Sequence, residues 1–312
     1  MFRHLHPTDS PRLLAFKQAV GRAEAFTLSQ AVQGTARPFS AVAYAGVALS
    51  PRAWQSCWIK TDGARIQSVI RAGPRSGPLA WEVRDLFLRR NYVHECADAL
   101  EDLAVPAGRS EARRLFLRLP QGSPVFDQAR RAGFAPTVGE TLYRAPAASE
   151  AMARLGVRPS LDTRPRTQRD DDALFRLYCA TTPVASRFGC GQTKAEWLDG
   201  AEKAGGRARE WVVEDSPGHV TALLQTADLP ASRCISAVWT ADSGADMAAL
   251  VASGLEGARQ GAAAVALVPA SSESLARLLE EIGFEALQTY DVLAKVLAAP
   301  VMETRRAMAA VG

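Results

Sequence analysis

The sequence has few cysteines and no long apolar run, and each of these shortages excludes a class of protein. Its five cysteines are odd in number and scattered, without the paired short spacings of a zinc site or a disulfide framework. We therefore expect reduced, mostly buried thiols and no metal. No uninterrupted apolar stretch approaches the roughly 20 residues of a membrane span, and the first residues lack the apolar core of a signal peptide. These features predict a cytoplasmic protein without membrane contact.

Lysine is also scarce, because 32 of the 37 basic residues are arginine. Residues 1–145 carry 20 Lys+Arg and 12 Asp+Glu, a net charge of +8, whereas the remainder carries 17 and 21, a net charge of −4. A basic half can attract phosphates or nucleic acid. Its arginines are dispersed rather than consecutive, however, which is typical of a solvated surface and argues against a nucleic-acid tail.

The chain contains one pattern of helix, glycine, phenylalanine and strand twice. QARRAGFAPTVGETLYR ends the first half and RLLEEIGFEALQTYDVLAK ends the second, with Gly133 and Gly283 150 residues apart. Each half also begins alike, with a short strand, a proline and an acidic residue before an amphipathic helix. The expected N-caps of these helices are Asp9 or Ser10 in the first half and Asp170 or Asp171 in the second.

Three strands separated by turns rich in Asp, Gly and Pro are expected next in each half. They span roughly 56–60, 65–72 and 79–88 in the first half, and 210–214, 219–226 and 234–240 in the second. A helix with an apolar face then leads to a buried strand that ends at a proline, at 115–119 and 264–268. A strand, a helix and a strand at this spacing indicate a parallel crossover.

This order of elements, with Gly-Phe after the last helix, resembles the GNAT superfamily of acyl-CoA-dependent N-acetyltransferases. The resemblance covers roughly 1–146 and 160–299 and suggests a tandem such as that of the mycothiol synthases. It implies an α/β protein of two GNAT-like domains, 1–146 and 160–312, joined by a linker at 147–159. We expect a separate mixed sheet of about six or seven strands in each domain, with parallel fourth and fifth strands that splay apart.

The acetyl-CoA motif of the superfamily is degenerate in both halves. In that family a Q/R-x-x-G-x-G/A loop precedes a helix, and its small residues let backbone N–H groups approach the pyrophosphate. The first half has RRNYVHECADAL at this place and the second has TADSGADMAAL. In the second, Asp242 stands where the family has Gln or Arg, and an aspartate repels a pyrophosphate. Literal matches beginning at Gln18 and Arg130 lack the strand-to-helix context that gives the motif meaning.

Few side chains remain as candidates for catalysis. The general acid that is frequent in the family is a tyrosine four residues before the Gly-Phe glycine, and Ala129 and Leu279 stand there instead. Glu82 and Asp85 in AWEVRDLFL are the candidate bases, because a half-buried carboxylate beside an amine can accept its proton. The alternative for both is a solvent-facing charge or a partner for Arg84.

Arg89 and Arg90 are the candidate ligands of acetyl-CoA or another acyl-CoA, since side-chain charge could replace the missing backbone cradle. His94 and Cys96 could be pictured as metal ligands or as a nucleophile. They have no third partner nearby in sequence, so we expect a histidine on a helix surface and a core thiol.

Three hypotheses about function follow. The first is acyl transfer from acyl-CoA to an unknown small-molecule or peptide amine, with an activity that the missing motifs weaken or abolish. The second is a noncatalytic module that binds a ligand or a protein. The third and weakest is association with nucleic acid through the basic first half. We expect a monomer or a homodimer.

Overall fold

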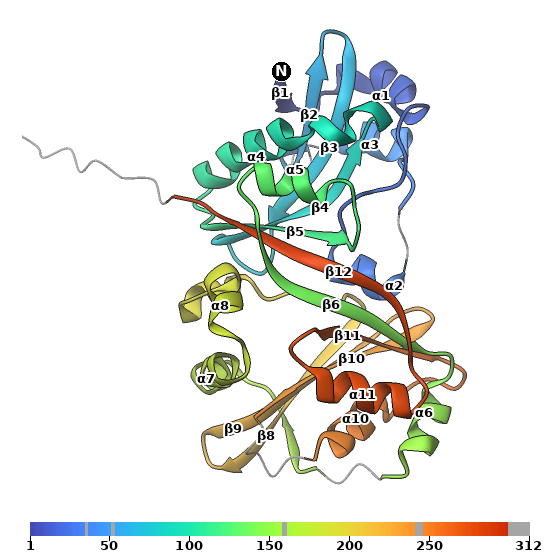
Figure 1. The fold of residues 1–312 in the computed structure, drawn as a ribbon, viewed down its shortest axis with the longest axis vertical. Helices are drawn as coiled ribbons and strands as arrows, with labels where there is room; N and C mark the ends of the chain where they lie inside the picture. Colours follow the sequence, from blue (N-terminus) through green and yellow to red (C-terminus); the bar gives the residue numbers. More distant parts are fainter. Residues whose placement is uncertain (35–36, 51–53, 158–160, 241–245, 299–312) are drawn as a thin grey trace, which may run out of the picture.

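The computed structural model describes residues 1–34, 37–50, 54–157, 161–240 and 246–298 (Figure 1). The first copy of the repeat contains strands β1 (Phe2–His4), β2 (Cys57–Asp62), β3 (Arg65–Pro74), β4 (Ala80–Leu88), β5 (Arg114–Pro120) and β6 (Ala135–Ala145). Its helices are α1 (Ser10–Lys17), α2 (Leu28–Gln33), α3 (Ala41–Leu49), α4 (Ala97–Arg109) and α5 (Phe126–Arg131). Helix α6 (Ala148–Leu155) follows, within the segment expected to be the linker.

The second copy repeats this order of elements. Its strands are β7 (Thr163–Pro165), β8 (Arg207–Ser216), β9 (His219–Asp228), β10 (Ser232–Trp239), β11 (Ala263–Pro269) and β12 (Glu285–Val296). Its helices are α7 (Asp171–Thr181), α8 (Val184–Cys190), α9 (Lys194–Asp199), α10 (Met247–Leu255) and α11 (Glu273–Glu281). None of the helices in the described ranges is long and apolar enough to span a membrane.

The start of each copy carries the same ion pair, which shows the repeat at the level of single residues. Arg3 lies 2.7 Å from Asp9, and Arg164 lies 2.6 Å from Asp170. Each aspartate also accepts a backbone N–H three residues earlier, from His6 or from Thr167. Asp9 and Asp170 occupy the N-cap positions of α1 and α7, as the sequence predicted.

The twelve strands of the described residues form one sheet, in the order β1-β2-β3-β4-β5-β12-β6-β11-β10-β9-β8-β7. The prediction of two separate sheets is therefore wrong. The reason is an exchange of the last strands, because β12 pairs with β5 of the first copy and β6 pairs with β11 of the second. The exchanged strands also pair with each other, so they join the two copies at the centre of the molecule (Figure 1). The parallel pairs β4–β5 and β10–β11 are as predicted.

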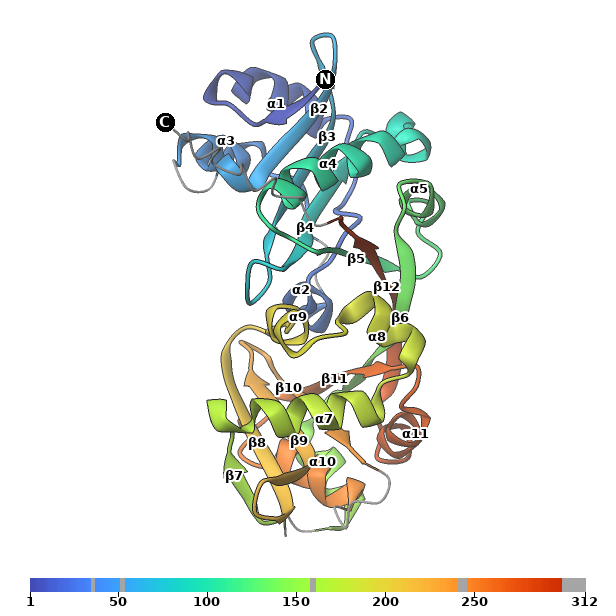
Figure 2. The same cartoon turned by 90° about the vertical axis from the view of Figure 1, so that its left-hand side faces the viewer.

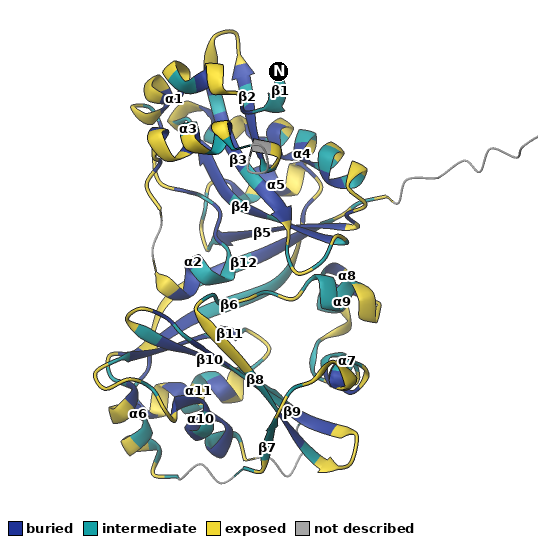
Figure 3. Ribbon diagram, turned by 180° about the vertical axis from the view of Figure 1, so that it is seen from behind, coloured by how far each residue is buried: buried dark blue, intermediate teal, exposed yellow. Residues whose placement is uncertain are grey.

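Helices cover both faces of the sheet in each copy (Figure 2). In the first copy α4 and α5 pack on one face through Leu100, Leu103 and Ala129, while α1 and α3 pack on the other through Leu13 and Tyr44. In the second copy α10 and α11 cover one face and α7 the other. The strands are accordingly buried in the middle of each half, and the outer surfaces of the helices are exposed (Figure 3).

Contacts between the copies fix α8, α9 and the segment after them against the first copy. Buried Arg114 of β5 lies 2.7 Å from Glu196 of α9. The turn between β3 and β4 approaches Asp199 so closely that a Cβ atom at Gly77 would lie 2.0 Å from the Asp199 carboxylate. The Asp199 carboxylate also accepts the backbone N–H of Leu79 at 2.9 Å. These contacts hold the second copy's helices beside the exchanged strands.

Candidate functional site

In the first copy, the space between the splayed parallel strands is filled by the chain itself. Strands β4 and β5 are in register only from Ala80 to Glu82 of β4, and then diverge. Residues 23–26, which we call the inserted segment, lie in the gap. The backbone N–H of Glu24 donates to the carbonyl of Leu86 at 2.8 Å, and that of Phe26 donates to the carbonyl of Arg118 at 3.0 Å. The segment thereby occupies the edges of both strands.

In the second copy, the corresponding space is open. Strands β10 and β11 are in register from Ser232↔Ala263 to Ile235↔Ala266. Beyond these pairs lies a cavity of about 720 Å³, lined by residues 234–240 of β10 and its C-terminal end and by residues 266–269 of β11. We call this cavity the second-copy cleft. It is therefore the second copy, rather than the first, that has room for a ligand between its parallel strands.

The second-copy cleft reaches both faces of the sheet. Val251, Leu275 and Leu279 of α10 and α11 line it on one face. Tyr178 of α7 and Ser186 of α8 line it on the other, together with Leu28 of the first copy's α2. Successive residues of a strand point to opposite faces, and Ile235 and Cys234 accordingly pack with the core clusters of opposite faces. Two molecules can thus approach the same strand ends from opposite sides.

A row of polar side chains crosses three strands beside the cleft. Ser236, Gln225 and Glu210 are in register on β10, β9 and β8, and all three line the cavity. Gln225 Nε2 donates to Glu210 Oε1 at 2.6 Å, and Arg166 Nη1 lies 2.6 Å from Glu210 Oε2. The row therefore presents a hydroxyl and an amide to the cleft, with the glutamate held at its outer end.

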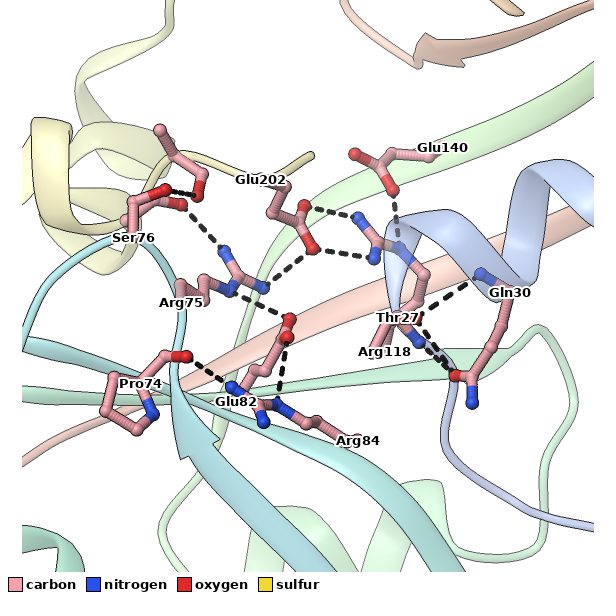
Figure 4. A network of polar contacts seen from close by, with 12 residues as sticks. Thr27, Gln30, Pro74, Arg75, Ser76, Glu82, Arg84, Arg118, Glu140 and Glu202 are labelled. Atoms are coloured by element: carbon pink, nitrogen blue, oxygen red, sulfur yellow. Dashed lines mark hydrogen bonds and ion pairs between the residues drawn. The ribbon is translucent and has the colours of Figure 1, made fainter. Parts of the chain in front are cut away.

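A network of charged residues from both copies forms another wall of the second-copy cleft (Figure 4). Arg118 of β5 is buried, with its side chain 1% exposed; its Nε lies 2.9 Å from Glu140 and its Nη2 lies 2.7 Å from Glu202. Arg75 lies 3.2 Å from Glu202. Burial alone would raise the pKa of Glu202, but Arg118 and Arg75 outweigh it and lower that pKa to about 2. Glu140 and Glu202 both line the cleft.

The two candidate bases lie in the first copy, outside the second-copy cleft. Asp85 is buried, with Arg71 at 2.7 Å, the Tyr44 hydroxyl at 2.9 Å and Gln30 Nε2 at 3.0 Å. These contacts use both of its carboxylate oxygens. The structure therefore places Asp85 in a polar cluster of the interior.

Glu82 lies in the charged network, 3.4 Å from Arg75 and 3.6 Å from Arg84. Burial raises its pKa, and Arg75 opposes that effect. It lines a small cavity of about 110 Å³, which shares Leu28, Glu202 and Lys203 with the second-copy cleft. The Arg84 partner that the sequence offered as an alternative is thus present.

The predicted phosphate ligands lie beside the filled gap of the first copy. Arg89 Nε donates to the carbonyl of Ile66 at 3.2 Å, and Arg90 is exposed where the chain turns into a short 3₁₀ helix. Close to them, His94 is exposed and Cys96 is buried. Neither arginine reaches the second-copy cleft, so they stay predictions for a separate site.

The corresponding loop of the second copy, with Asp242 and Ala245, lies outside the described residues. The helix that follows begins at Met247, and Asp246 caps it by accepting the N–H of Ala248 at 2.9 Å. Leu279, in the family's tyrosine position, is buried and lines the cleft. Tyr178, which no sequence motif marks, also lines the cleft, and its hydroxyl donates to the carbonyl of Gly191 at 3.1 Å.

The sequence matches no protein-family model and no curated protein. Solved structures match it along most of its length. A GCN5-related N-acetyltransferase from Sphaerobacter thermophilus has a TM-score of 0.51 at 14% identity, covering 95% of each chain. A functionally unknown protein from Staphylococcus epidermidis has a TM-score of 0.52 at 11% identity, covering 77% of this chain and 94% of its own. A tandem GNAT protein from the clavulanic acid biosynthesis pathway has a TM-score of 0.48 at 12% identity, covering 95% of this chain and 98% of its own.

The chain has the GNAT fold, and the repeated order of its elements shows that the fold occurs twice in tandem. The resemblance and the fold class predicted from the sequence are therefore confirmed. Identities this low establish the fold alone, so the chemistry has to be inferred from the cleft.

Proposed function

We propose that the second copy transfers an acyl group from an acyl-CoA thioester to an amine, in the cleft between β10 and β11. One observation carries this proposal. The two copies share a fold with splayed parallel strands, and in the described structure the gap is filled by the inserted segment in the first copy and is a cavity of about 720 Å³ in the second.

The inserted segment indicates which kind of ligand fits such a gap. It is an extended chain whose N–H groups at Glu24 and Phe26 bond to the carbonyls of the two strands. The pairing of β10 with β11 ends at Ile235 and Ala266, and beyond these residues the facing edges of the two strands are not paired with each other. An extended ligand with amide groups can add itself to such edges as a strand does. The pantetheine arm of acyl-CoA is a chain of this kind, with two amides before the thioester.

The two faces of the cleft separate donor from acceptor. We place the acyl-CoA on the face of α10 and α11 and the amine on the face of α2, α7 and α8. The amine nitrogen attacks the thioester carbonyl carbon, a C–N bond forms, the C–S bond breaks and the thiolate leaves. The acceptor amine reacts in its neutral form, so an ammonium group first gives one proton to solvent, and after the attack the nitrogen's remaining surplus proton passes to the thiolate or to solvent. A thiol is acidic enough to leave without a dedicated general acid, so Leu279 in the tyrosine position slows this step without forbidding it.

A noncatalytic binding module is the second candidate, and Asp246 is the observation that favours it. Its carboxylate already takes one of the N–H groups at the start of α10, and its charge repels a pyrophosphate at a helix end that would otherwise attract one. The phosphates of an acyl-CoA would therefore be held weakly there.

Calorimetry with acetyl-CoA tests the proposal. Ala237→Phe places a ring in the second-copy cleft on the face of α10 and should abolish binding, whereas Arg89→Ala combined with Arg90→Ala should leave it unchanged. The opposite pattern would return the site to the first copy. Release of CoA with a polyamine, an aminoglycoside or a peptide N-terminus then separates the two candidates, because a binding module shows acetyl-CoA binding without turnover.

A further inference from the structure

We propose that Glu140, a residue of the first copy, binds the cationic amine of the acceptor in the second copy's cleft. This inference rests on the proposed function.

Glu140 differs from the other carboxylates of the cleft in the use of its oxygens. Both oxygens of Glu202 bond to Arg118, and one also lies 3.2 Å from Arg75. Both oxygens of Glu210 are taken as well, one by Gln225 and one by an arginine. Glu140 has a single polar partner among the described residues, since only its Oε2 contacts Arg118, at 2.9 Å. Its other oxygen points away from Arg118 (Figure 4) and is available to a ligand.

The exchange of strands brings Glu140 to the second-copy cleft. On β6 it stands between Pro269 of β11 and Tyr290 of β12, and both of these neighbours belong to the second copy. Val138, two residues earlier on the same strand, also lines the cavity. Residues two apart lie on the same face of a strand. Leu142 lies on that face too, and it packs in one hydrophobic cluster with residues of α2. This is the face that we assign to the acceptor.

The chemistry of this wall favours an ammonium group over a neutral or anionic one. A charge-assisted hydrogen bond from an ammonium group to the available carboxylate oxygen is stronger than a bond from a neutral donor. Arg118 holds the other oxygen, so Glu140 is fixed in place before any ligand arrives. The neighbouring walls, at Leu28, Val138 and Leu267, are apolar. The expected acceptor is therefore an amine that is protonated at neutral pH and carried on an apolar body.

Calorimetry with two small probes tests the role of Glu140 in the absence of acyl-CoA. The probes are 2-phenylethylammonium and the neutral alcohol 2-phenylethanol, which have the same chain length and similar shape. Glu140→Gln should weaken binding of the ammonium by about tenfold or more and leave the alcohol unchanged. Glu140→Asp, which keeps the charge, should restore part of the affinity. Glu256→Gln, at an exposed carboxylate outside the cleft, is the matched control and should change neither.

Three results would overturn the assignment. They are unchanged ammonium binding in Glu140→Gln, equal loss of both probes, and no preference for the ammonium in the unaltered protein. A thermal melt of each variant separates loss of fold from loss of contact. Because the probes bind without acyl-CoA, a protein that discriminates between them but transfers no acyl group would refute the proposed reaction while supporting the role of Glu140.

Discussion

Arg118 and Leu267 stand at the same place in the two copies, each two residues before the proline that ends its strand. In the first copy this position carries a buried guanidinium that holds two glutamates, and its carbonyl receives the inserted segment. In the second copy it carries an apolar side chain that lines the cleft. One copy thus uses this position to organise the junction between the halves, and the other uses it to form a binding site.

Arg118→Met should destabilise the fold strongly. It leaves Glu140 and Glu202 without their shared cation, and removing one partner of a buried ion pair costs about 3–5 kcal/mol. Urea unfolding at pH 7 measures the change. Arg118→Lys keeps the charge but loses the paired geometry, so its free energy of unfolding should lie between those of Arg118→Met and the unaltered protein. A loss below about 1 kcal/mol for Arg118→Met, in the range of an exposed pair, would show that the network contributes little.

The stability of the protein should fall in acid partly because of Glu202. Its pKa in the folded state, about 2, lies below the ordinary value for a glutamate. A depressed pKa contributes stability that is complete above the unfolded-state pKa and is lost as the pH falls toward the folded-state value. As the pH is lowered from 5.5 to 2.5, the urea concentration at the midpoint of unfolding should therefore decline less steeply in Glu202→Gln than in the unaltered protein. Equal slopes would exclude Glu202 as a source of the acid sensitivity.

Ionisation of Glu24 should have the opposite effect on stability from ionisation of Glu202. Burial of the inserted segment raises the pKa of its carboxyl, against a hydrogen bond from Ser123. A raised carboxyl pKa costs stability once the pH exceeds the unfolded-state value. Glu24→Gln should therefore stabilise the protein at pH 7 and give no such gain at pH 3. Glu95→Gln, at an exposed carboxylate, is the control and should be neutral. A destabilised Glu24→Gln at pH 7 would show that the ionised carboxylate is favourable.

Gly77→Ala should weaken the contact between the copies. Its new methyl group would displace the Asp199 carboxylate and break the bond from Leu79, and overpacking of this kind typically costs about 1–3 kcal/mol. Gly46→Ala is the matched control, because a methyl group at that position of α3 meets no atom within 4 Å. There the change should stabilise the helix by about 0.5–1 kcal/mol. Equal effects at the two glycines would rule out the close approach to Asp199.

The repeat and most of its elements could be predicted from the sequence because they depend on local patterns. Alternation of apolar residues located β5 and β11, and capping chemistry located the starts of α1 and α7. The exchange of β6 and β12 could not be predicted in this way. Either strand has the length and the apolar pattern to pair in its own copy, and the choice of partner is decided by tertiary packing.

The site was harder to predict for a related reason. The phosphate-loop motif pointed to Arg89 and Arg90, because they are the charges nearest to that loop in the first copy. The gap of the first copy is filled by residues that follow α1, far from β4 and β5 in sequence. Glu140 reaches the cleft only through strand exchange. The alternation of β8, β9 and β10 does indicate that Glu210 and Gln225 share a face, but the register that joins them to Ser236 comes from the fold.

The exchange of strands also sets an order of events during synthesis. Strand β5 is complete at residue 120. It lies between β4 and β12 in the sheet, and β12 ends only at residue 296. Until the ribosome has made β12, the first copy has an unpaired edge at β5, and β6 has no native partner until β11, which ends at residue 269, has been made. An exposed edge of this kind invites pairing with another chain. A nascent first half is therefore expected to depend on chaperones, and a polypeptide truncated before β12 should aggregate rather than persist as a folded domain.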